Sequence, residues 1–89
     1  MVYLVSYDLG QPNRDYKKLV EKIKSYGTWA KPLESLWLIK TDVAAVQVAN
    51  DLKTVMDKDD GLVVIQVKSN WSTFNVSQEV TKWMNENIA

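Results

Sequence analysis

Residues 2–8 read Val2-Tyr3-Leu4-Val5-Ser6-Tyr7-Asp8, and this stretch decides the fold. It is rich in β-branched and aromatic side chains and is followed by the turn-forming residues Gly10 and Pro12, so it is predicted to be a β-strand. Successive side chains of a strand point to opposite faces of the sheet. Both faces of this strand are largely apolar, and the second one ends in Ser6 and Asp8. The strand is therefore predicted to be central, with a carboxylate at its end.

The composition limits what the chain can do. Its 89 residues suit a single domain, and 46% hydrophobic with 25% charged residues is typical of a soluble globular protein. No run of about 18 apolar residues is available to span a membrane and no signal peptide is visible, so a cytoplasmic location is expected. The chain has no cysteine and no histidine. Disulfides, zinc enzymes and catalysis by a serine or cysteine with a histidine are therefore excluded within one chain.

The net charge of zero hides an asymmetry. Residues 1–40 carry seven basic and four acidic side chains, whereas residues 41–89 carry four basic and seven acidic ones. A balanced total argues against tight nonspecific binding of nucleic acid by one chain, because that affinity comes mainly from neutralised phosphates. A local basic face is compatible with the same total.

The first half of the chain after the strand is predicted to form a helix and a hairpin. Apolar residues recur at helical spacing within residues 13–26, and Gly27 stands where a left-handed cap is expected. Residues 28–33 and 35–40 then form two strands. Because Pro32 has no N–H to donate, the first of them is predicted to lie at an edge of the sheet.

The second half repeats the pattern and adds a tail. Thr41 or Asp42 is predicted to cap a second helix that ends near Asp57. Residues 62–67 read Leu62-Val63-Val64-Ile65-Gln66-Val67, follow the turn at residues 57–61 and are predicted to be the fourth strand. Residues 77–88 have a helical spacing of apolar side chains, so a third helix is expected there.

The order of these elements predicts the fold class. Two strand-helix-strand units in succession, with right-handed crossovers, give a ferredoxin-like βαββαβ arrangement of the α+β class. Its four-stranded antiparallel sheet has the strand order 4-1-3-2. Residues 1–68 are predicted to form this domain, and residues 69–89 are predicted to be a C-terminal helical extension of it.

The sheet is predicted to need a second covering layer. The two main helices cover one face, yet the first, third and fourth strands are apolar on both faces. Such an exposed patch is larger than monomers usually carry, so either the C-terminal helix or a second copy of the chain must cover it. We expect a homodimer with the tail taking part. The predicted interface residues are Val2, Leu4, Ser6 and Trp37.

Several acidic residues are predicted to gather at one end of the sheet, namely Asp8, Glu34 and the turn at residues 57–60. Carboxylates without histidine suit magnesium or manganese. Acids in turns also serve solubility and capping, and Asp8 is equally compatible with a structural role in which loop N–H groups satisfy it. In a dimer formed through that face, the two copies of Asp8 can approach each other and bind one metal ion.

The basic side of the first helix has two interpretations. Arg14, Lys17 and Lys18 form either an ordinary solvated face or a surface for phosphates. The aromatic residues also suggest a second way of binding nucleic acid, in which bases stack on aromatic side chains as in RNA-recognition domains. The third strand lacks the basic-glycine-aromatic pattern of those domains, which favours a core or interface position for Trp37.

Three segments resemble a known family. The run from Tyr3 to Leu9, the basic helix that ends in Tyr26-Gly27 and the run Glu34-Ser35-Leu36-Trp37 are similar to the small ferredoxin-like dimeric protein of the CRISPR spacer-integration complex. The segment from Tyr26 to Trp37 also resembles short bacterial proteins described as SinR-like, which have a related fold. The resemblance extends from residue 1 to about residue 67.

The resemblance implies a function. Wider relatives include the virulence-associated D toxins and an antitoxin endoribonuclease, so it implies a homodimer that cleaves RNA or DNA with Mg²⁺. Asp8 is then the catalytic residue and the metal ligand, with the basic helix on the nucleic acid. The chain departs from the family pattern at Leu33 in place of a glutamine and at Trp37 in place of a phenylalanine. The alternative is a non-catalytic dimeric scaffold, interaction or antitoxin-type module in which Asp8 is structural.

Overall fold

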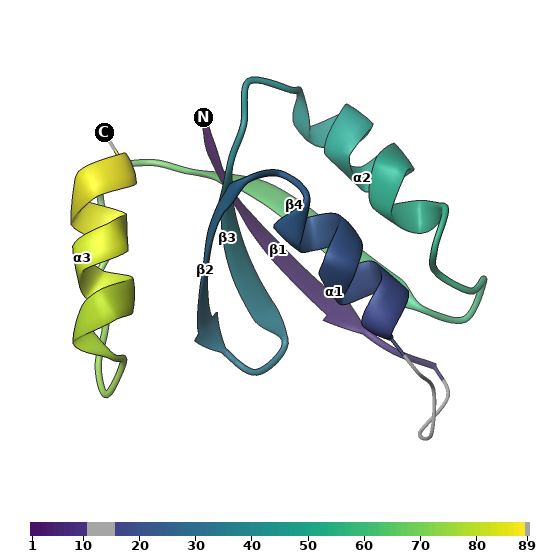
Figure 1. Ribbon diagram of the computed structural model, residues 1–89, viewed down its shortest axis with the longest axis horizontal. Helices are drawn as coiled ribbons and strands as arrows, with labels where there is room; N and C mark the ends of the chain where they lie inside the picture. The colour runs from purple at the N-terminus through teal and green to yellow at the C-terminus, as the bar shows by residue number, and fades with distance from the viewer. Residues whose placement is uncertain (11–15, 89) are drawn as a thin grey trace.

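The computed structural model describes residues 1–10 and 16–88. It shows the predicted order of strands and helices (Figure 1). The elements are β1 (Val2–Asp8), α1 (Lys17–Lys24), β2 (Thr28–Leu33), β3 (Leu36–Lys40), α2 (Ala45–Lys53), β4 (Gly61–Val67) and α3 (Gln78–Asn87). None of the helices in the described ranges has the length and the apolar character needed to cross a membrane.

The four strands form one antiparallel sheet in the order β2-β3-β1-β4, as predicted. Within it, Leu4 of the central strand β1 lies opposite Leu38 of β3 and Ile65 of β4. β2 is an edge strand, in agreement with Pro32, and its pairing with β3 shifts register between Ala30 and Leu33. The ferredoxin-like α+β fold is thus confirmed.

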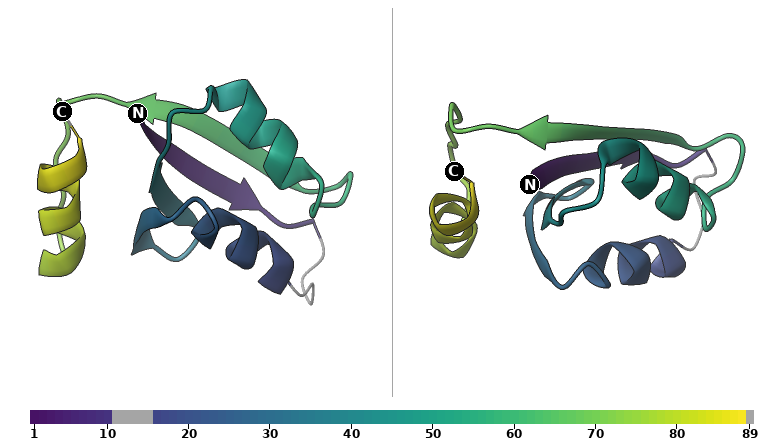
Figure 2. Two further views of the ribbon diagram at one scale, coloured as in Figure 1. Left: turned by 45° about the horizontal axis from the view of Figure 1, so that its top comes forward. Right: turned by 90° about the horizontal axis from the view of Figure 1, so that it is seen from above.

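One face of the sheet carries the main core, under α1 and α2. Both helices lie on the same side of the sheet (Figure 2). The apolar stripe predicted for each helix supplies the side chains that face the sheet, which explains why these segments fold as amphipathic helices. The buried residues of this core are Tyr3, Val5, Tyr7, Leu19, Ile23, Trp37, Ile39, Val48 and Leu52.

α3 lies on the opposite side of the sheet from α1 and α2 (Figure 1). Its N-cap is Ser77, whose Oγ accepts a hydrogen bond from the Val80 N–H (3.2 Å), so the helix begins where a side-chain acceptor is available. The second buried cluster combines residues of the sheet and of α3. Its members are Val2, Ala30, Leu38, Met84 and Ile88.

α3 covers only part of this second face. Val63 and Ile65 of the edge strand β4 face the same side as Leu4, to judge from the strand register. They remain 50% and 55% exposed. The tail helix therefore supplies a second layer at one end of the sheet and leaves an apolar strip uncovered at the other.

The boundaries of the helices differ from prediction at α2. Its N-cap is Ala44, not Thr41 or Asp42, and the helix ends at Lys53, before the predicted Asp57. Thr41 instead accepts a hydrogen bond at Oγ1 from the Val43 N–H (3.3 Å). Because this hydrogen bond closes a turn between Thr41 and Val43, the helix begins later in the chain, after Ala44.

The C-terminal end of α1 agrees with prediction. Gly27 has a φ of +96°, a conformation that favours glycine because side chains with a Cβ are strained there. The chain turns at this point from α1 into β2. The predicted helix start at residues 13–15 lies outside the described residues.

Candidate functional site

Asp8 is the last residue of β1 and lies opposite Gly61 of β4. β3 begins at Leu36, which pairs with Ser6, so no β3 residue lies opposite Asp8. Gly61 has no side chain to cover it. The carboxylate is therefore exposed.

Gly10, two residues after Asp8, is held by Asp60. The backbone N–H of Gly10 donates to Asp60 Oδ1 (2.8 Å), and the backbone N–H of Asp57 donates to Asp60 Oδ2 (2.8 Å). Gly10 also packs closely, since a Cβ built there would lie 2.6 Å from the carbonyl oxygen of Asp59. The end of β1 is thus joined to the α2–β4 turn by one carboxylate and a close backbone contact.

The predicted gathering of acids is only partly present. The β1 end and the turn at residues 57–60 meet through Gly10, as expected. The β2–β3 turn lies at the same end, because Ser6 Oγ donates to the carbonyl oxygen of Ser35 (3.2 Å). Even so, within residues 1–10 and 16–88 no three acidic side chains come close enough together to hold a metal ion.

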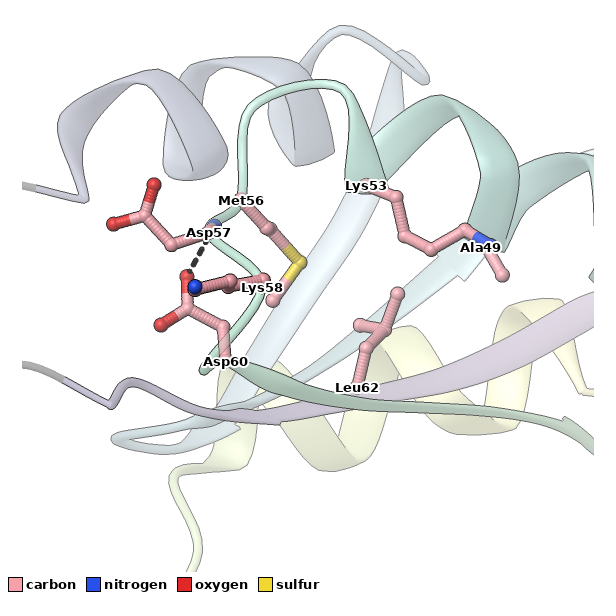
Figure 3. A pocket seen from close by; sticks show the side chains of 7 residues that line it. All are labelled: Ala49, Lys53, Met56, Asp57, Lys58, Asp60 and Leu62. Atoms are coloured by element: carbon pink, nitrogen blue, oxygen red, sulfur yellow. Dashed lines mark hydrogen bonds between the residues drawn. The ribbon is translucent and has the colours of Figure 1, made fainter.

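A pocket of about 450 Å³ lies beside this turn, between α2 and β4 (Figure 3). Figure 3 shows Lys53 and Met56 on one side of it and Leu62 of β4 on another. Asp57 and Asp60 line it as well, joined by the hydrogen bond described above. The carboxylate of Asp60 is thus engaged with the backbone.

The predicted phosphate-binding residues lie on and before α1. Lys17 and Lys18 are exposed, as a surface for phosphates requires, and Arg14 lies outside the described residues. On the same helix, the side chain of Lys22 contacts Asp51 of α2 (Nζ to Oδ1, 3.3 Å). That contact draws one of the helix's cations toward α2.

Asp51 was not singled out from the sequence, and it also accepts a hydrogen bond from Tyr26 Oη (2.8 Å). Burial, followed by this hydrogen bond and the charge of Asp51, raises the pKa of Tyr26 to about 12. The group links the end of α1 to α2. The sequence around Asp51 does not indicate that it joins two helices, because its partner Tyr26 is 25 residues away.

The four predicted interface residues do not share one surface. Val2 is 3% exposed because α3 covers it, while Leu4 and Ser6 are half-buried. Trp37 lies on the other face, is 2% exposed, and donates from Nε1 to Tyr7 Oη (3.3 Å). It is a core residue of the single chain, since its position opposite Val5 assigns it to the face under α1 and α2.

Fold and site together define a class: a ferredoxin-like domain with an exposed acidic residue at the end of its first strand. The family model described as CRISPR associated protein Cas2 matches residues 1–73, and the chain belongs to this family. Neither a curated protein nor a solved structure matches the chain. The match confirms the CRISPR-associated part of the resemblance. It ends before α3 begins at Gln78, so α3 lies outside the matched region.

Proposed function

We propose that the protein is a homodimeric endonuclease that cleaves RNA or DNA with Mg²⁺. The observation that carries this proposal is the placement of Asp8. It is an exposed carboxylate at the end of the central strand, on a chain of the CRISPR associated family. Gly10, two residues further along the chain, is held by Asp60, so the backbone next to the carboxylate has a defined position.

The carboxylate oxygens available at this site suit magnesium only if two chains contribute them. One chain provides Asp8 without a group of three acids in the described ranges. Magnesium is usually bound through one or two carboxylates and keeps several water molecules. Two copies of Asp8 fit this pattern. When bound there, the ion would supply positive charge to the phosphoryl group being transferred.

The chain's own cations bind the substrate in this proposal. Lys17 and Lys18 are exposed on α1 and neutralise backbone phosphates. Arg14 is assigned the same role on the sequence alone. Because phosphate contacts carry no base information, the proposal includes both RNA and DNA.

The uncovered strip on β4 supports the dimer. Val63 and Ile65 are at least half exposed, and β4 is an edge strand with backbone groups that no neighbouring strand in the sheet pairs. Exposed apolar edge strands favour pairing with another chain. A second copy on this strip would lie beside Ser6 and Asp8, because Val63 is the neighbour of Ser6 in the sheet.

A magnesium titration with single-stranded RNA and duplex DNA tests the catalytic part. We expect cleavage that requires Mg²⁺ and that Asp8→Asn abolishes. The matched control is Asp42→Asn, which removes another exposed carboxylate, one that follows β3 at the opposite end of the sheet. Cleavage that persists in Asp8→Asn would show that Asp8 is not catalytic.

The oligomeric state tests the dimer. Ile65→Lys places a charge in the exposed strip, whereas Val46→Lys places one on α2 at a side chain that is 65% exposed. We expect a dimer by analytical ultracentrifugation for the wild type and for Val46→Lys, and a monomer for Ile65→Lys. A monomeric wild type at all concentrations would contradict the proposal.

The second candidate function is a non-catalytic dimeric scaffold. The observation that favours it is that the described residues bring no three acids together. In that case Asp8 is a structural or surface residue. A dimer that neither binds Mg²⁺ nor cleaves either substrate would support this second function over the first.

A further inference from the structure

The tail helix α3 is held on the sheet by a small set of side chains. Residues 68–77 join it to β4 without forming a helix or a strand (Figure 1). Met84 is the one buried residue of Gln78–Asn87, and the C-cap Ile88 is buried as well. An isolated helix of ten residues is marginal in water, so the position of α3 depends on this packing. α3 can therefore leave the sheet as a unit while the four strands stay paired.

The uncovered strip that begins on β4 continues across the second face of the sheet. Val63 pairs with Ser6 of β1, Ser6 pairs with Leu36 of β3, and Leu36 pairs with Leu33 of β2. Directly paired residues point to the same face. Leu33 is 58% exposed, in line with the half-exposed Val63 and Ile65. All four strands thus contribute to the strip.

The strip is continuous with the surface that α3 covers. Leu4 lies opposite Leu38, which α3 covers, and opposite Ile65, which it does not. The part of the second face under α3 is built from Val2, Ala30, Leu38 and the half-buried Leu4 and Val67. The second face is therefore one apolar surface, of which α3 covers about one end.

The uncovered strip alone is too small for a stable dimer. Its three exposed aliphatic side chains offer on the order of 100 Å² or less each. A stable protein interface buries about 800 Å² on each partner, so the strip supplies less than half of that area. The remaining apolar area of the same face lies under α3. A second copy that uses the whole face must take the place of this helix.

The outward side of α3 does not replace the area that the helix covers. Its exposed residues are polar or charged, namely Gln78, Glu79, Lys82, Asn85 and Glu86. Interface centres are depleted in charged side chains because these must lose water on burial. With α3 in place, the second copy therefore meets a polar helix beside a narrow apolar strip.

We propose that α3 is an autoinhibitory helix: while it lies on its own sheet it keeps a second copy of the chain from the full second face, and its release lets that copy pack there. The inference rests on the dimer of the proposed function and adds the control of that dimer. Each chain must release its own α3, so the free energy of α3 docking opposes dimerisation twice.

Sedimentation equilibrium gives the dissociation constant of the dimer for the wild type and for variants that loosen α3. Ser77→Ala removes the side-chain oxygen that accepts from the Val80 N–H. Loss of an N-cap typically makes a helix about 5-fold less stable, so the dissociation constant should fall about 25-fold when both chains are counted. Met84→Ala, which removes the buried side chain of α3 and leaves the sheet unchanged, should lower it at least as much.

A variant that strengthens α3 should have the opposite effect. Asn85→Ala improves the helix at an exposed position by about 2- to 3-fold, so the dissociation constant should rise about 4- to 9-fold. The control Lys82→Gln changes another exposed side chain of α3 and should leave the constant unchanged. Ser77→Ala combined with Ile65→Lys should be monomeric, because the released face and the strip act as one surface.

A dissociation constant that is unchanged or raised in both Ser77→Ala and Met84→Ala, in protein that circular dichroism shows to be folded, would overturn the inference. Association of the Ser77→Ala and Ile65→Lys double variant would overturn it too, since the partner would then bind elsewhere. A wild-type dimer that ignores every α3 variant refutes the autoinhibitory helix and leaves the dimer in place. Dimers that respond as expected but cleave neither RNA nor DNA refute the nuclease function and support the role of α3.

Discussion

Asp60 offers the sharpest test of how the site is built. Its two carboxylate oxygens accept hydrogen bonds from the backbone N–H groups of Gly10 and Asp57, both at 2.8 Å. Asp60→Asn keeps one acceptor oxygen and turns an NH₂ group toward a backbone donor. Asp60→Ala removes both acceptors and leaves the two N–H groups to water.

The expected loss in the free energy of unfolding follows from these two hydrogen bonds. A typical hydrogen bond contributes about 1 kcal/mol net, and one to a charged group about 1.5–3 kcal/mol. Asp60 is half-buried, so water compensates part of the loss. We therefore expect Asp60→Asn to lower the free energy of unfolding by about 1–2 kcal/mol and Asp60→Ala by about 2–3 kcal/mol.

Urea denaturation measures the free energy of unfolding of each variant and of the wild type. The matched control is Asp59→Asn, which changes the same charge in the same turn and should stay within about 0.5 kcal/mol of the wild type. Because the bond to Asp60 holds Gly10, two residues from Asp8, Asp60→Ala should also lower any Mg²⁺-dependent cleavage under conditions where the variant is folded. If Asp60→Ala and Asp59→Asn unfold at the same urea concentration, the bonds of Asp60 to Gly10 and Asp57 do not stabilise the fold.

Three further outcomes are expected. The raised pKa of Tyr26 means that its bond to Asp51 stabilises the fold below pH about 10 and is lost as pH rises through about 12. Tyr26→Phe should therefore remove a tyrosinate step near pH 12 from an absorbance titration. Trp37→Phe leaves a gap in the core and loses the bond to Tyr7, and should cost about 1–3 kcal/mol in thermal unfolding. Gly27→Ala should cost about 1–2 kcal/mol through its φ of +96° alone, because no heavy atom beyond its chain neighbours lies within 4 Å of the added methyl group; an unchanged midpoint would contradict this.

Features within short stretches of the sequence predicted the strands and their order in the sheet. The strand at residues 2–8 was predicted with the bounds that the structure shows, and Pro32 placed β2 at an edge. Both inferences depend on properties of the backbone: alternation of side chains and the missing N–H of proline. The start of α2 was missed because Thr41 uses its hydroxyl in a preceding turn, an option that a capping residue always has.

The covering of the second face of the sheet could be predicted only in part from the sequence. The pattern predicted that it needs a cover, and α3 provides one over Val2 and Leu38 but not over Val63 and Ile65. Hydrophobicity alone cannot tell which end of a strand a distant helix will reach. The same limit applied to Trp37, because a strand that is apolar on both faces gives no preference for either one.

The exposure of Asp8 has a cause that lies entirely in its neighbours. On one side the paired residue is Gly61, which has no side chain, and on the other side β3 has already ended. A buried carboxylate would require a partner, and its ionised form would be costly without one. An exposed carboxylate keeps its charge at little cost and remains accessible to a metal ion or a second chain. The glycine at position 61 and the short third strand are therefore what make Asp8 available for the function proposed for it.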